Sequence, residues 1–148
     1  MEIKLATNCD IEHWLKLVDK VKQNFPGLET QQALDAHKNV VLDFINKQSA
    51  ICAKKNDCIV GILLFSKENH MLCFLAVDPD NRRQHIAEKM VSYMLTFMDS
   101  TKDVVVTTYR EGVPEGMAAR AFYKRFGFVA GKQTEEFGSP VQEFILKR

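Results

Sequence analysis

The fold is decided by the stretch Phe74-Leu-Ala-Val-Asp-Pro-Asp-Asn-Arg-Arg-Gln-His-Ile-Ala-Glu-Lys-Met90. An apolar run ends at Val77 and predicts a strand, four turn residues follow, and the remainder has helical spacing. The first N–H groups of a helix have no partner inside it, and its dipole is positive there, so such a turn attracts anions. Arg82 and Arg83 add full charges at the same place. The stretch therefore predicts a site for a diphosphate.

The rest of the chain predicts the element order β-α-α-β-β-β-α-β-α-β-β. Strands are expected at 2–7, 49–55, 58–66, 70–77, 103–109, 128–133 and 141–147, and helices near 10–24, 30–47, 83–99 and 115–126. Helices inserted between strands favour an α/β fold with one mixed sheet of about seven strands and helices on both faces.

Length and composition limit the class of protein. The chain has 148 residues, which predicts a single domain over 1–148. Its net charge of +1 argues against a nucleic-acid partner held by bulk electrostatics. No apolar run approaches the ~20 residues of a membrane helix, so no membrane partner is expected. The N-terminus lacks a signal-peptide pattern, and we expect a cytoplasmic protein.

The four cysteines do not predict a metal site. None is spaced as Cys-x-x-Cys, and Cys52 and Cys58 have no paired histidine nearby. We therefore expect reduced thiols and no bound metal, with Cys73 in the core because it falls within an apolar strand.

Two motifs together resemble the GNAT family of N-acetyltransferases. Val77-x-Pro79-x-x-Arg82-x-x-His85-Ile86-Ala87 is similar to that family's acetyl-CoA motif. The segment Ala119-Arg-Ala-Phe-Tyr123-Lys-Arg-Phe-Gly127-Phe128 resembles its Ala-x-x-Phe-Tyr-x-x-x-Gly-Phe helix. The resemblance covers residues 50–148 well and the first part of the chain by element order alone.

The resemblance implies an acetyl-CoA donor and a set of residues that hold it. Backbone N–H groups of residues 83–87 would grip the pyrophosphate, and main-chain groups of the preceding strand would bind the pantetheine arm. The thioester carbonyl would lie near a strand break at Ala76–Val77. The cofactor-binding residues implied are Leu75, Ala76, Val77, Arg82, Arg83, Gln84, His85, Ile86, Ala87 and Tyr123.

The chain departs from the family pattern at a few positions. Arg83 and His85 stand where the family usually has glycine, and Gly116 stands where it often has asparagine. We expect helical backbone at His85, which does not demand glycine, so that its side chain either crowds the phosphate or donates a hydrogen bond to it. The alternative for this turn is a solvated helix start, with Asn81 and Gln84 as a capping pair.

Tyr123 is the candidate general acid. By resemblance, the Tyr of the Phe-Tyr pair protonates the leaving thiolate of coenzyme A. The ordinary pKa values of a phenol, near ~10, and a thiol, near ~8.5, are reasonably matched. The alternative is a tyrosine that only packs beside Phe122 and Phe126.

The general base is less well defined. Glu111 follows the strand at 103–109 at the end where substrate should lie, and His70 titrates in a useful range. Either is alternatively an ordinary polar residue at a strand end. The run Glu135-Glu136 either draws a cationic acceptor or belongs to a solvated loop.

The leading hypothesis is direct transfer of an acetyl group from acetyl-CoA to the primary amine of a small molecule or peptide. The second is a non-catalytic acyl-CoA-binding or sensing module of the same fold, and a homodimer is left open for either. A nucleotide- or phosphate-binding α/β protein is a third, but the chain lacks a glycine-rich loop with Lys-Ser/Thr.

Overall fold

A computed structural model describes residues 1–25, 27–28, 30–82, 84–136 and 138–148 of the chain. The strands are β1 (Glu2–Leu5), β2 (Ala50–Lys55), β3 (Cys58–Ser66), β4 (Met71–Val77), β5 (Val104–Tyr109), β6 (Val129–Glu136) and β7 (Ser139–Leu146). The helices are α1 (Ile11–Val21), α2 (Gln31–Asn46), α3 (Ile86–Leu95) and α4 (Met117–Phe126), with 3₁₀ turns η1 (Asn8–Asp10), η2 (Lys22–Asn24), η3 (Pro79–Asn81) and η4 (Pro114–Gly116).

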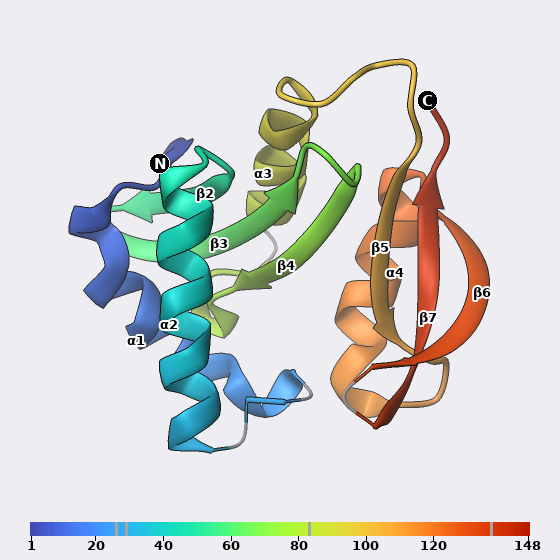
Figure 1. Ribbon diagram of the computed structural model, residues 1–148, viewed down its shortest axis with the longest axis horizontal. Coiled ribbons are helices and arrows are strands. Elements are labelled where there is room, and N and C mark those ends of the chain that lie inside the picture. The colour runs from blue at the N-terminus through green and yellow to red at the C-terminus, as the bar shows by residue number, and fades with distance from the viewer. Residues whose placement is uncertain (26, 29, 83, 137) are drawn as a thin grey trace.

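The predicted α/β fold and element order are confirmed. The seven described strands form one sheet in the order β1-β2-β3-β4-β5-β7-β6. Neighbouring strands are antiparallel except β4 and β5, which run parallel. Figure 1 shows β1 to β4 as one group and β5 to β7 as a second group beside it.

Helices cover both faces of the sheet, as the sequence predicted. Helices α1 and α2 pack on one face around the fully buried Trp14, and α3 and α4 pack on the other around Met90 and Tyr123 (Figure 1). Because side chains alternate along a strand, β3 contributes to both cores. Its residues on the α1–α2 face are Ile62 and Leu64, and those on the α3–α4 face are Leu63 and Phe65.

Helix α3 is shorter than the predicted 83–99. It begins at Ile86, after His85 in the left-handed region, and the cap makes no side-chain hydrogen bond. The predicted capping pair Asn81 and Gln84 is therefore wrong. The turn is stabilised instead by Asp78, whose Oδ1 accepts a hydrogen bond from the amide of Asp80 at 3.0 Å.

Two other helix ends follow from the sequence. Helix α2 begins after Thr30, whose Oγ1 accepts a hydrogen bond from the amide of Ala33 at 3.0 Å and caps the helix. Helix α4 ends at Gly127, where φ is +122°, a conformation that glycine adopts without strain. The glycine fixes the point at which the chain leaves α4 for β6.

Strand β4 contains a bulge at Cys73. Leu72 pairs with Phe65 and Phe74 pairs with Leu64, so one residue of β4 has no partner in β3. A bulge bends its strand and redirects the side chain of the extra residue. Cys73 is consequently exposed, and its predicted place in the core is wrong.

Candidate functional site

Strands β4 and β5 are neighbours that separate along most of their length. They share the register pair Met71–Val105, and no second pair joins them in the described part of the chain. Strand β5 is paired with β7 from Val104 to Tyr109, so it is the β4 side of β5 that opens. Figure 1 shows the two strands diverging, and a cleft of about 1530 Å³ is lined by both.

The cleft has a chamber on each side of the diverging strands. Lining residues of the α3–α4 chamber include Leu75, Ile86, Ala87, Val106, Phe122 and Tyr123. Lining residues of the α1–α2 chamber include Val21, Phe25, Leu28, His37, Phe44 and Phe74. Both sets of residues line one continuous cleft, so two ligands could approach one another from opposite faces of the sheet.

The turn before α3 places a charge and a helix end at the cleft. Arg82 is exposed, has extended backbone and lines the cleft, while Arg83 lies outside the described residues. Gln84 is exposed, and its Oε1 accepts a hydrogen bond from Lys55 at 3.4 Å. The first N–H groups of α3 have no partner within the helix, and Ile86 and Ala87 of this turn line the cleft. This arrangement can bind an anion.

The backbone at His85 has a conformation that glycine adopts more easily than other residues. Its φ is +59°, in the left-handed region that costs a side-chain-bearing residue about 1–2 kcal/mol. The expectation of helical backbone at His85 is therefore wrong. The side chain is exposed, and its Nδ1 lies 3.1 Å from Oε2 of Glu88.

Close packing of α3 on the sheet depends on Gly61. A Cβ at this position would lie 2.8 Å from Cγ2 of Ile86 and 2.8 Å from Cε of Met90. The absence of a side chain lets the first turn of α3 approach β3, where Gly61 pairs with Val77. The helix start is thereby held beside the end of β4.

Tyr123 lies in the wall of the α3–α4 chamber. It is 4% exposed, and its ring centroid lies 5.6 Å from that of Phe122 and 5.4 Å from that of Phe128. Burial raises the pKa of the phenol, so its hydroxyl stays protonated well into the alkaline range. Cys73 also lines this cleft and is accessible to solvent, but the protein around its thiol desolvates it and raises its pKa to about 11.

The main chain of β4 is regular where a break was predicted. Leu75, Ala76 and Val77 pair with Leu63, Ile62 and Gly61 in register, so the expected break at Ala76–Val77 is wrong. The irregular position is the bulge at Cys73. Beyond Met71, the edge of β4 that faces β5 is not used by a described strand pair, which leaves main-chain groups available to a ligand.

The two predicted bases lie away from the cleft. Glu111 is exposed in the turn after β5, and His70 lies in the turn before β4 with φ of +52°. The backbone oxygen of His70 accepts a hydrogen bond from Val105 at 3.0 Å, at the closed end of the two strands. Neither side chain is among the described residues that line the cleft, so neither is brought to Tyr123.

A carboxylate that the sequence marked only as part of an acidic run is in the cleft. Glu136, at the end of β6, accepts a hydrogen bond from Thr107 of β5 at 2.7 Å through Oε2. Its charge also contributes to the raised pKa of the Cys73 thiol, after the larger effect of burial. The contact joins residues far apart in the chain, which no local pattern could have indicated.

Gly116 has a steric reason for replacing asparagine. A Cβ at this position would lie 2.5 Å from Cβ of Tyr109, so the space beside the start of α4 is already occupied. Tyr109 ends β5 and lines the cleft. The departure from the family pattern is thus coupled to a bulky neighbour.

We expect Gly116→Asn to lower the free energy of unfolding by about 1–3 kcal/mol, because the new side chain must displace Tyr109. Urea denaturation measures the loss. Gly112→Asn is the matched control, since Gly112 has open space around it and a φ of +92° that asparagine tolerates better than most residues. Equal losses in the two variants would contradict the steric explanation.

No helix within the described ranges is long and apolar enough to cross a membrane. The same residues contain no group of three or more histidine, cysteine, aspartate or glutamate side chains that could hold a metal ion.

Solved structures share this fold. A GNAT-family acetyltransferase from Bacillus cereus superposes with a TM-score of 0.77 at 20% identity, over 99% of this chain and 96% of its own. The PaiA N-acetyltransferase from Thermoplasma acidophilum, in complex with coenzyme A, has a TM-score of 0.71 at 14% identity and 96% coverage of each chain. A ribosomal-protein-alanine N-acetyltransferase from Brucella melitensis has a TM-score of 0.76 at 15% identity and 98% coverage of each.

The family itself is established by sequence. No curated protein matches this chain. The model of the acetyltransferase (GNAT) family, however, matches residues 14–128, which extend from α1 to the end of the Phe-Tyr motif. Both motifs, the diverging strands and the turn before α3 fall within that range, and the chain belongs to the GNAT family of acetyltransferases.

Proposed function

We propose that the protein is an N-acetyltransferase that moves an acetyl group from acetyl-CoA directly to a primary amine. One observation carries the proposal: a single cleft runs from the first turn of α3, along the open edge of β4, to Tyr123. A diphosphate needs an anion site, and a pantetheine arm needs an unpaired strand edge. A thioester needs a buried proton donor for its leaving group.

The donor would lie in the α3–α4 chamber. The pyrophosphate would accept hydrogen bonds from the first N–H groups of α3, with Arg82 beside it, because charge-assisted contacts are the stronger ones. The pantetheine arm would bond to main-chain groups of residues 75–77, as an added strand does, since β5 leaves that edge open. The acetyl group would then lie where the two chambers meet.

The reaction requires attack by the amine on the thioester and departure of the coenzyme A thiolate. The amine, after losing a proton as an ammonium ion, attacks the thioester carbonyl, so that an N–C bond forms. Collapse of the intermediate breaks the C–S bond and leaves the electron pair on sulfur. Tyr123 protonates that thiolate and is reprotonated, through solvent, by the second proton that the nitrogen gives up. The net products are the amide, the free thiol of coenzyme A and one released proton.

The bulge at Cys73 is our candidate for the oxyanion site. An oxyanion is stabilised by fixed N–H donors that no other group has taken. The bulge gives β4 a residue without a partner in β3, at the place where the two strands begin to part. In this proposal the thioester carbonyl would lie nearer the middle of β4 than Ala76–Val77.

A thiol-release assay tests the proposal. Purified protein is mixed with acetyl-CoA and a panel of primary amines, and coenzyme A binding is measured separately by calorimetry. We expect release of thiol that depends on the amine, together with binding of coenzyme A alone. Binding without release by any amine would contradict the enzyme and favour the second candidate, a non-catalytic acyl-CoA-binding module.

That second candidate is supported by specific observations. Neither predicted base reaches the cleft, and His85 occupies a strained position in the anion-binding turn. A sensing module would keep the donor chamber and would not need a base. The two functions differ in turnover rather than in affinity for coenzyme A.

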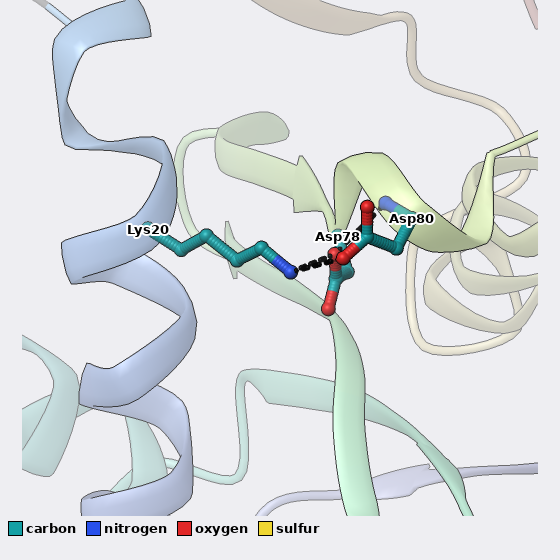
Figure 2. A network of polar contacts seen from close by, with 3 residues as sticks. All are labelled: Lys20, Asp78 and Asp80. Carbon is teal, nitrogen blue, oxygen red and sulfur yellow. Dashed lines mark hydrogen bonds and ion pairs between the residues drawn. The ribbon is translucent and has the colours of Figure 1, made fainter.

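A lysine on α1 neutralises two carboxylates beside the proposed phosphate site. Nζ of Lys20 lies 2.7 Å from Oδ1 of Asp78 and 2.7 Å from Oδ2 of Asp80, and Figure 2 shows it reaching from α1 to both. Burial opposes ionisation of Asp78, but hydrogen bonds from Lys20 and the Asp80 amide outweigh it and lower the pKa of that carboxyl. Lys20 thus forms an ion pair with each of the two carboxylates.

We expect Lys20→Met to weaken coenzyme A binding by roughly two- to tenfold, because two uncompensated negative charges would then repel the pyrophosphate. Calorimetry at low and high salt measures the effect, which should shrink as salt screens it. Lys16→Met is the control, since Lys16 is exposed on the same helix and makes no ion pair with a described residue. A loss that is equal in both variants would speak against the neutralising role.

A further inference from the structure

We infer that the acceptor is a primary amine with a single positive charge on an apolar, aromatic or alkyl body, which binds in the α1–α2 chamber with its ammonium group at Glu136. The inference rests on the proposed function and names its substrate class. It is carried by the position of one carboxylate and by the aromatic residues that line the same cleft.

Glu136 lies where an acceptor nitrogen must arrive. Its Oε2 is held at 2.7 Å by the hydroxyl of Thr107 on β5, while its charge is felt by the thiol of Cys73 on β4. The carboxylate is therefore held beside β5 at Thr107 and lies near enough to Cys73, at the bulge of β4, to act on its thiol. It is also exposed, so an ammonium ion can reach it.

The cleft that Glu136 lines also has an aromatic wall. The rings of Phe25 and Phe74 are stacked with centroids 4.4 Å apart, and the ring of His37 lies 5.0 Å from that of Phe74. Val21, Leu28 and Phe44 extend the same surface. Stacked rings of this kind offer a face to a flat or alkyl body, and burying that body supplies about 25 cal/mol per Å² of apolar area.

His37 keeps this wall neutral. It is 9% exposed, its Nε2 makes no hydrogen bond within the described part of the chain, and burial lowers the pKa of the ring. A neutral imidazole does not repel an incoming cation. The described carboxylates that line the cleft are Glu88 of α3, Glu115 of η4 and Glu136 of β6.

The charged residues that line the cleft argue against free amino acids and polyamines as acceptors. The arginines that line the cleft, Arg82 and Arg125, belong to the turn before α3 and to α4, so no described cation of the α1–α2 chamber would pair with a carboxylate of the substrate. A free amino acid would therefore bring an unpaired carboxylate into an apolar space. A polyamine would bring a second ammonium group into this largely apolar chamber, where it would lose hydration. Besides Glu136, the described carboxylates of the cleft are Glu88 of α3 and Glu115 of η4, and neither belongs to the α1–α2 wall.

A comparison of acceptors tests the inference. Thiol release from acetyl-CoA is measured with 2-phenylethylamine, hexylamine, phenylalanine and spermidine. We expect kcat/KM for 2-phenylethylamine and hexylamine to exceed that for phenylalanine and spermidine by about tenfold or more, since an unpaired charge in an apolar site is costly. Equal or higher values for spermidine or phenylalanine would overturn the substrate class and leave the acetyltransferase intact.

Separate substitutions test where the ammonium group of the acceptor binds and where its apolar body binds. Glu136→Gln should lower kcat/KM for 2-phenylethylamine by about tenfold or more, with acetyl-CoA affinity unchanged, because a charge-assisted contact is lost. Glu135→Gln is the matched control, since Glu135 is exposed next to it and is not a described lining residue. Equal effects of the two substitutions would refute the role of Glu136.

A third substitution tests where the apolar body of the amine binds, and it changes an exposed residue rather than a core residue. Val40 lines the chamber on α2 and is 46% exposed, so Val40→Asp should fold. It should lower the ratio of the 2-phenylethylamine rate to the spermidine rate, since it puts a carboxylate in the apolar wall. An unchanged ratio would refute the location of the body. Absence of release with every amine would overturn the proposed function together with the inference.

Discussion

Replacing Tyr123 with phenylalanine should lower kcat by about 10²–10⁴-fold, the usual contribution of general acid catalysis, and leave the affinity for acetyl-CoA within about tenfold. The substitution removes one hydroxyl and keeps the ring that packs against Phe122 and Phe128. Burial keeps the phenol protonated, so the wild-type enzyme should not lose activity through ionisation of this group near the ordinary tyrosine pKa. Steady-state thiol release and calorimetry measure the two quantities.

The matched control is Tyr93→Phe. Tyr93 lies on α3, half-buried, where its ring contacts that of Phe97, and it is not among the described lining residues. Its loss should leave kcat unchanged. If Tyr123→Phe turned over within a factor of about three of wild type, the hydroxyl would not be the essential acid, and water would have to protonate the thiolate.

Sequence patterns were sufficient to predict those parts of the site whose interacting residues are neighbours in the chain. The apolar run before Val77, the turn and the following helix are contiguous, so strand, turn and helix N-terminus could be predicted together. Gly127 likewise marks the end of α4 through its own conformation. Local chemistry and periodicity decide such features, because the residues that interact are neighbours in the chain.

The features that were missed depend on tertiary contacts. The bulge at Cys73 arises from its register with β3, and alternation within β4 alone could not indicate it. The left-handed conformation of His85 is imposed by the geometry of the turn, against the preference of its side chain. Glu136 reaches Thr107 across the β6–β7 hairpin and β7, so its role as a cleft carboxylate was visible only once the sheet was assembled.

We expect that a single substitution can abolish coenzyme A binding while the protein still folds. Ala87 is half-buried in the first turn of α3 and lines the cleft, where a larger side chain would project across the N–H groups that are left for a phosphate. Leucine has nearly the same helix propensity as alanine. We therefore expect Ala87→Leu to keep a near-native far-UV circular dichroism spectrum and to lose stabilisation by coenzyme A.

The expected loss is large enough to measure by thermal unfolding. A ligand present at a hundred times its Kd stabilises the wild type by about 2.7 kcal/mol, which for a chain of this length raises Tm by about 5–10 °C. Ala87→Leu should show none of that rise. Ala130→Leu applies the same change on exposed β6, away from the described lining of the cleft, and should keep all of it. A full rise in Tm for Ala87→Leu would mean that the phosphate does not lie on the first turn of α3, and the proposed path of the donor along β4 would have to be given up with it.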